Sequence, residues 1–336
     1  MKDIRKVIGL LLCMTICCYM TGKEKKNLNI VFIGNSITQG ALLENPRHEA
    51  PPVKAALYLR RQPSVGTVRY SNQGVSGSTT FDFLPQTDLL FPKVVRVADQ
   101  FKDETWATLI FSIMLGTNDS AITGPNGAPA SPAKYYENMK TIIDKLLALY
   151  PECKIVLHRP VWYSPNTYNG AKYLEEGLNR LQSYYPELQA LVLDYSKHFP
   201  GQVFMGDTDG FDYFKTHYKN ELFPEKGNAG TFYLHPNRKG ASALGELWGK
   251  AILGALDMIR RMLQKGVVSA SRLAKFQDSL KLAEIDRHTL TSLVKRIYVF
   301  EDKRLEIEFY FRDEYRIMQE YVTALSGQES GRERSA

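Results

Sequence analysis

Short apolar runs alternate with longer segments of helical periodicity from about residue 27 to about residue 258. The apolar runs are rich in β-branched and aromatic residues. They predict strands at 28–34, 67–74, 108–116, 154–161 and 202–207. The segments between them predict helices at 50–61, 131–150 and 173–185, with a last helix that begins near Lys239. Because such alternation is typical of a parallel sheet with helices on both faces, we expect a three-layer α/β/α domain with five parallel strands.

Polar or small residues stand at the ends of three predicted strands. Ser36 follows the first strand after Gly34 and Asn35, Gly74 ends the second, and Asn118 follows the third. In a parallel sheet the carboxyl ends of the strands share one edge, where the chemistry of such folds is found. We therefore expect these three residues to lie close together on that edge.

A serine needs a neighbouring base before it becomes a useful nucleophile, and that base is most often a histidine. Among the six histidines of the chain, His235 follows a predicted loop and precedes the last helix. Pro236 restricts His235 to an extended backbone, which suits a side chain presented from a loop. We predict that His235 is the base for Ser36.

These positions together resemble the blocks of the SGNH (GDSL-like) hydrolase family over about 27–258. The blocks here are "GNSIT" around Ser36, "NQGVSGST" with Gly74, "GTND" with Asn118, and the segment with His235. The resemblance implies a flavodoxin-like fold, with Ser36 as nucleophile and His235 as base. It also implies an oxyanion hole formed by the backbone N–H groups of Ser36 and Gly74 and by the side-chain amide of Asn118. No cofactor and no metal ion is expected, since the chain has no nucleotide-binding or metal-binding motif.

Two positions depart from the family pattern. Asn35 stands where an aspartate usually precedes the nucleophile, and Phe232 stands three residues before the histidine, where the family has its acid. One interpretation is a Ser-His dyad whose histidine is oriented by a backbone carbonyl. The other is a displaced acid, for which the candidates are Asp207, Asp209 and Asp212. We expect Asp119 to bond backbone groups of the rim instead.

The charges of the chain are concentrated at its ends. The chain has 43 Lys and Arg and 36 Asp and Glu. Residues 1–26 contain six basic and two acidic residues, and residues 259–336 contain fifteen basic and twelve acidic residues. The region between them has 22 of each. The central region therefore has no net field that would attract nucleic acid or an anionic membrane.

The first 26 residues have a basic start followed by an apolar run, which predicts an export signal. Alternatively, the chain could be lipidated at Cys17 or Cys18. We expect attachment to a membrane only in that case. The one cysteine beyond the segment, Cys153, is expected to be a buried small residue. We therefore expect an exported protein that is periplasmic, bound to the cell surface or secreted.

The C-terminal part differs in character. Residues 262–325 resemble the C-terminal segment of large serine recombinases, with a strand pair around 297–311 that turns at 301–303, and residues 326–336 are expected to be disordered. One interpretation is a gene fusion, and the other is a helix-and-hairpin extension native to this protein. The predicted domains are thus 1–26 (signal), 27–260 (hydrolase) and 261–336 (extension).

The function that the resemblance implies is an exported serine esterase that removes O-acetyl groups from carbohydrate. A small-molecule or polysaccharide ester is then the partner, and no nucleic acid is expected despite the tail. The alternatives are a lysophospholipase or thioesterase of the same fold and a non-catalytic carbohydrate-binding homologue. A DNA-associated protein is disfavoured by the export signal and the balanced central charge.

Overall fold

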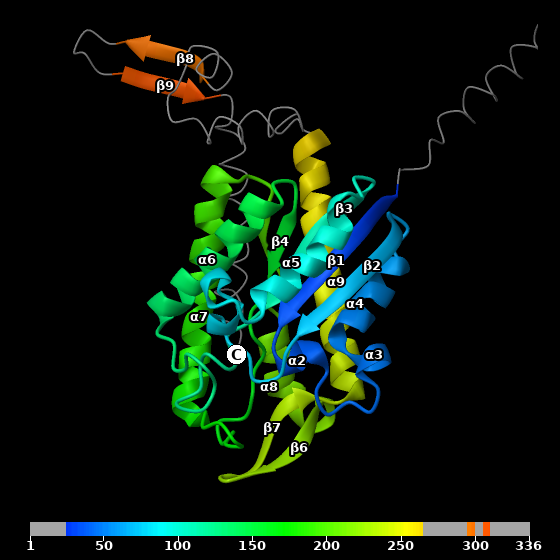
Figure 1. The fold of residues 1–336 in the computed structure, drawn as a ribbon, viewed down its shortest axis with the longest axis vertical. Coiled ribbons are helices and arrows are strands. Elements are labelled where there is room, and N and C mark those ends of the chain that lie inside the picture. Colours follow the sequence, from blue (N-terminus) through cyan, green and yellow to red (C-terminus); the bar gives the residue numbers. More distant parts are fainter. Residues whose placement is uncertain (1–24, 265–293, 300–304, 310–336) are drawn as a thin grey trace, which may run out of the picture.

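The computed structural model describes residues 25–264, 294–299 and 305–309 (Figure 1). The predicted export segment, with Cys17 and Cys18, lies outside the described residues apart from its last two positions. The predicted tail helix and the predicted disordered end also lie outside them.

A sheet of five parallel strands forms the centre of the molecule, which confirms the predicted fold class. The strands are β1 (Lys26–Gly34), β2 (Val65–Gly74), β3 (Ala107–Met114), β4 (Lys154–Leu157) and β5 (Val203–Met205). Their order is β2-β1-β3-β4-β5, so the order reverses beside β1. Ligands of such sheets bind outside the carboxyl ends of the strands at this switch point.

The register of the central strands places three segments of the rim at the same level. Gly34, the last residue of β1, lies opposite Gly74 of β2 and opposite Met114 of β3. The residues that follow these three positions therefore leave the sheet side by side. Ser36, the loop after Gly74 and the loop with Asn118 are the segments so placed.

Helices cover both faces of the sheet (Figure 1). One layer contains α4 (Pro51–Arg60), α8 (Gly210–Glu221) and α9 (Arg238–Gln264). The other contains α5 (Phe91–Lys102), α6 (Pro132–Leu149) and α7 (Leu174–His198). Shorter helices lie in the rim loops: α2 (Ser36–Gln39), α3 (Pro46–Glu49) and the 3₁₀ turns η1 (Phe81–Phe83) and η2 (Pro85–Thr87).

The predicted helices form, but their bounds and number differ in two respects. The helix expected at 173–185 continues through Pro186 to His198. Helices α5 and α8 were not predicted. Helix α6 begins as the sequence indicates, since the Ser131 hydroxyl accepts a bond from the Lys134 N–H at 3.2 Å and Pro132 opens the first turn.

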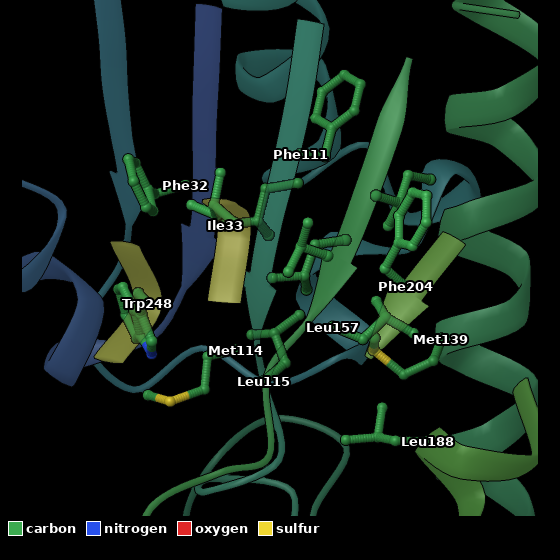
Figure 2. Close-up of a cluster of buried hydrophobic side chains, with 14 of the residues drawn as sticks. Phe32, Ile33, Phe111, Met114, Leu115, Met139, Leu157, Leu188, Phe204 and Trp248 are labelled. Atoms are coloured by element: carbon green, nitrogen blue, oxygen red, sulfur yellow. The ribbon is translucent and has the colours of Figure 1, made fainter. Parts of the chain in front are cut away.

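Large apolar side chains fill the space between the layers (Figure 2). On one face Trp248 of α9 stacks on Phe32 of β1, with ring centroids 6.0 Å apart. On the other, Met139 of α6 and Leu188 of α7 are buried against the sheet. Each such side chain contributes about 1.5–3 kcal/mol through burial, so this core stabilises the sheet that carries the rim residues. Cys153 is buried and free, as expected.

Two antiparallel hairpins complete the described structure. Strands β6 (Leu222–Gly227) and β7 (Gly230–Pro236) join α8 to α9 and project beyond the carboxyl edge of the sheet (Figure 1). His235 therefore lies on a strand, and the expectation that it follows a loop was wrong. In the tail, β8 (Val294–Val299) pairs with β9 (Leu305–Phe309), which confirms the predicted strand pair, while its turn lies outside the described residues.

Candidate active site

Ser36 opens the four-residue helix α2 directly after β1. The Asn35 side chain accepts a hydrogen bond from the Ile37 N–H at 3.0 Å, so the asparagine caps this helix as an aspartate would. Gly34 is required for the turn, because a Cβ there would lie 2.0 Å from the Thr38 hydroxyl oxygen. The tight strand-to-helix turn thus holds the Ser36 hydroxyl at the sheet edge.

The structure brings Ser36 and His235 together across 199 positions of sequence. The Ser36 Oγ and the His235 Nε2 lie 2.9 Å apart. Both residues are largely buried, with 6% and 9% of their surface exposed. A base at hydrogen-bond distance from a serine hydroxyl is the arrangement that activates this nucleophile.

An acid that was not predicted from the sequence reaches the other side of the His235 ring. The Glu225 carboxylate of β6 lies 2.9 Å (Oε1) and 3.1 Å (Oε2) from His235 Nδ1. Its Oε1 also accepts the backbone N–H of His235 at 3.2 Å. A carboxylate only accepts, so Nδ1 carries a proton and Nε2 is free to take the proton of Ser36.

Glu225 lies directly across the hairpin from Phe232, the position where the family has its acid. The acid therefore stands on β6, the strand that pairs with β7. Phe232 is buried, with 1% of its surface exposed. A turn signal was present in the sequence, since "GNAG" at 227–230 separates two short segments with β-compatible residues. Pairing those segments would have placed Glu225 opposite Phe232.

None of the three aspartates proposed from the sequence forms a hydrogen bond or an ion pair with His235 in the structure. The Asp207 Oδ1 accepts the N–H groups of Asp209 at 3.1 Å and of Gly210 at 3.3 Å, so it holds the start of α8. Burial raises the pKa of Asp207 to about 7. Asp212 is exposed and lies 3.9 Å from the Arg159 guanidinium. The interpretation of a Ser-His dyad is replaced by a continuous Ser36–His235–Glu225 chain of hydrogen bonds.

The predicted use of the Gly74 N–H conflicts with the structure. This N–H already donates to the Asn72 Oδ1 at 2.9 Å. The glycine is needed there for packing, because a Cβ would lie 2.3 Å from the backbone nitrogen of Gln39 in α2. Gly74 therefore fits the strand end to the nucleophile helix and does not present a free donor.

Gly77, three residues further on, has the features that Gly74 lacks. Its φ of +79° is a left-handed conformation that favours glycine, and a Cβ there would meet open space. Within the described part of the chain, neither the Gly77 N–H nor the Ser36 N–H has a hydrogen-bond acceptor. The Asn118 amide nitrogen donates to the carbonyl of the next residue, Ser78, at 2.8 Å, so Gly77 and Asn118 are neighbours.

Asp119 fixes the loop that carries Gly77, as the sequence analysis expected of it. Its Oδ1 accepts the Thr80 N–H at 2.9 Å and also the Thr80 hydroxyl. The same hydroxyl oxygen accepts the Asn138 amide at 2.9 Å. Burial raises the pKa of Asp119 to about 6. These bonds join the loop after β2 to the loop after β3.

Among the residues that the structure covers, no group of three His, Cys, Asp or Glu side chains could hold a metal ion. Within the same ranges, no helix combines the length and the apolar character needed to cross a membrane.

Comparison with protein families gives a match over most of the described domain. The model of the GDSL-like lipase/acylhydrolase family matches residues 32–243. Among curated proteins, no sequence matches the chain.

Several solved structures are similar, all at low identity. A carbohydrate acetylesterase from Sinorhizobium meliloti is 17% identical, with a TM-score of 0.46, 68% of this chain covered and 99% of that one. An aryl esterase from M. smegmatis is 16% identical, with a TM-score of 0.46 and coverages of 68% and 99%. A lipase/acylhydrolase from Enterococcus faecalis is 18% identical, with a TM-score of 0.41 and coverages of 68% and 96%.

Proposed function

Because the chain belongs to the GDSL-like lipase/acylhydrolase family, we propose that it is an exported serine esterase that removes O-acetyl groups from carbohydrate. The observation that carries the chemistry is the Ser36–His235–Glu225 chain, with contacts of 2.9 Å on either side of the imidazole. The preference for acetyl groups and sugars is what the resemblance to exported members of the family implies, and the export rests on the first 26 residues.

In the proposed reaction, the Ser36 hydroxyl oxygen attacks the ester carbonyl carbon while His235 Nε2 takes the hydroxyl proton. Glu225 keeps the Nδ1 proton in place and stabilises the imidazolium that forms. The tetrahedral intermediate then collapses, and the imidazolium gives its proton to the leaving alcohol. A water molecule, activated by the same Nε2, attacks the acyl-serine and releases the carboxylic acid.

The negative charge of the tetrahedral oxygen needs donors that are already in position. We assign these to the Ser36 and Gly77 N–H groups and to the Asn118 side-chain amide. Two of the three come from the sequence analysis, and Gly77 takes the place of Gly74. Removing one such donor typically lowers turnover by ~10²–10³.

The non-catalytic alternative was based on Phe232, which stands where the family has its acid. Glu225 lies 2.9 Å from His235 Nδ1, so this reason for the alternative no longer applies. The lysophospholipase or thioesterase alternative differs in the length of the acyl group and is separated by the assay below.

The test is hydrolysis of p-nitrophenyl esters from acetate to octanoate, followed by release of acetate from an acetylated polysaccharide. We expect turnover to be highest for acetate, and the Ser36→Ala variant to lose ~10³-fold or more. A fluorophosphonate should label the Ser36 peptide, while Ser71→Ala, a serine on β2, serves as a matched control with full labelling. Labelling at another serine would refute the assignment of the nucleophile, and a preference for octanoate would favour the lipase-like alternative.

A further inference from the structure

The Asn118 carboxamide is held by hydrogen bonds at both of its ends. Its Nδ2 donates to the Ser78 carbonyl at 2.8 Å, and its Oδ1 lies 2.6 Å from the Tyr173 hydroxyl. A backbone carbonyl can only accept, so the atom that faces Ser78 must be the nitrogen and the atom that faces Tyr173 must be the oxygen. Tyr173 is therefore the donor in the second bond, and the orientation of the amide has no ambiguity.

One hydrogen of the Asn118 amide remains after these bonds. The bond to Ser78 uses one of the two Nδ2 hydrogens, and among the described residues the second has no acceptor. We propose that Tyr173 is a positioning residue for the oxyanion hole, because its hydroxyl fixes the Asn118 amide with this free N–H directed at the developing charge. This inference rests on the proposed esterase function.

Tyr173 remains a donor over the whole working range of pH. It is 3% exposed, and burial, with smaller contributions from the charges of Asp119 and Glu225, raises the pKa of its hydroxyl well above the usual value. A donor on Oδ1 also draws electron density from the amide and so strengthens the opposite N–H as a donor. The Tyr173 hydroxyl thus both orients and polarises the group that would hold the oxyanion.

The surroundings of Tyr173 hold its ring in this position. The ring packs edge-on against Tyr163, with centroids 5.4 Å apart, and the Tyr163 hydroxyl bonds the Ser120 hydroxyl at 2.9 Å, on the same loop as Asn118. The next residue, Leu174, has a φ of +53°, which is uncommon for a residue with a side chain. Strained backbone of this kind is often found where a side chain must be aimed at a functional group.

The segment that leads to Tyr173 also contacts the hairpin that carries the acid and the base. Ser164 exchanges two bonds with Tyr233 of β7, from its N–H to the Tyr233 carbonyl at 2.9 Å and from the Tyr233 N–H to its hydroxyl at 2.8 Å. The Asn166 amide donates to the Thr231 carbonyl at 2.7 Å. One loop between β4 and α7 therefore braces the His235 strand and ends at the residue that orients Asn118.

The experiment is a double-mutant cycle of Tyr173→Phe and Asn118→Ala, measured with p-nitrophenyl acetate. Tyr173→Phe keeps the ring and removes only the donor, so kcat should fall about tenfold with KM within twofold. In the Asn118→Ala background the same change should have almost no effect, since the amide it orients is gone. The control is Tyr184→Phe, which removes another buried hydroxyl, bonded to the Ala130 carbonyl at 2.7 Å, and should leave kcat within twofold.

The outcomes separate this inference from the proposed function. If the parent chain shows no Ser36-dependent hydrolysis, the proposed function fails. If hydrolysis depends on Ser36 but Tyr173→Phe lowers kcat equally in both backgrounds, or changes KM alone, Tyr173 does not act through Asn118 and the inference is overturned.

Should Tyr173→Phe fail to fold, fluorinated tyrosines placed at position 173 keep the shape of the side chain and vary its strength as a donor. We then expect kcat to change steadily along the series with constant KM in the parent background. A kcat that is constant along the series would overturn the inference.

Discussion

Glu225 is the residue on which the proposed mechanism depends most directly, and Glu225→Gln is its sharpest perturbation. The glutamine has the same shape but can present either an oxygen or an NH₂ group to the histidine. Oε1 of Glu225 accepts both the Nδ1 proton and the His235 backbone N–H, while Oε2 lies 3.1 Å from Nδ1. In the variant, an NH₂ group would occupy one of these two positions beside the ring.

The expected loss follows from what the carboxylate does for the imidazole. An NH₂ group beside Nδ1 favours the tautomer with its proton on Nε2, which cannot accept the proton of Ser36. Even with the right tautomer, the imidazolium loses its negative partner, and this partner is only 15% exposed and therefore poorly replaced by water. An equivalent change in a serine protease triad lowers kcat by ~10⁴. We expect ~10³–10⁴ here, or about 4–5.5 kcal/mol of activation free energy.

The assay is steady-state hydrolysis of p-nitrophenyl acetate, with a thermal melt of each variant. The loss should lie in kcat, with KM within about threefold, because Glu225 acts on the transition state through His235. Glu221→Gln is a matched control: Glu221 is a buried glutamate at the end of α8, paired with Lys239 at 3.0 Å, and its carboxylate forms no hydrogen bond with His235. This control should change stability but keep kcat within threefold.

A loss below threefold in a folded Glu225→Gln variant would refute the reasoning. The imidazole would then need no carboxylate, and a Ser-His dyad would be the correct description. A loss of the same size in Glu221→Gln would show that the effect comes from general disturbance of the hairpin.

Three further predictions concern the rim and the tail. Gly74→Ala should lower the melting temperature by 5 °C or more, because its methyl group would lie 2.3 Å from the Gln39 nitrogen. Gly77→Ala places its methyl group in open space and should cost only backbone strain. A stable Gly74→Ala variant without turnover would restore Gly74 to the oxyanion hole. Burial raises the pKa of Asp119 from 3.8 to about 6, so this carboxyl contributes stability that is present below pH 3.8 and is lost as the pH rises through 6. The stability of Asp119→Asn relative to the parent should therefore rise by roughly 2 kcal/mol from pH 4 to pH 7 in thermal melts, and a constant difference would contradict this. Truncation after Gln264 should leave turnover within twofold and the melting temperature within a few degrees, and a loss of either would show that the tail is integrated with the enzyme.

The sheet and the place of Ser36 at its edge could be predicted because their signals are local. Residues 30–33 are all apolar, which is typical of a strand buried on both faces, and "GNSIT" directly follows them. The same holds for Asn118 after β3. Parallel pairing then places these strand ends at one edge without any further information.

The hairpin, and the glycine that we propose for the oxyanion hole, could not be predicted in the same way because they depend on pairing and on backbone torsion. β6 contains Pro224 and Lys226 and exposes alternate residues, so its apolar signal is weak. For the glycine, the sequence offers two candidates three residues apart. The strand end is the simpler choice, but only the structure shows that the Gly74 N–H is already bonded and that the Gly77 N–H is not.

The position of the acid leads to one last prediction, on Phe232→Asp. With a Ser-His dyad, an aspartate at 232 would supply the missing acid and raise turnover. The structure reverses this expectation, because Glu225 already bonds Nδ1 at 2.9 Å and lies directly across the hairpin from position 232. The new carboxylate would lie near the first and repel it, and the loss of a buried phenylalanine costs about 3–5 kcal/mol. We therefore expect both kcat and the melting temperature to fall. A rise in kcat would show that Glu225 does not act as the acid and that position 232 still can.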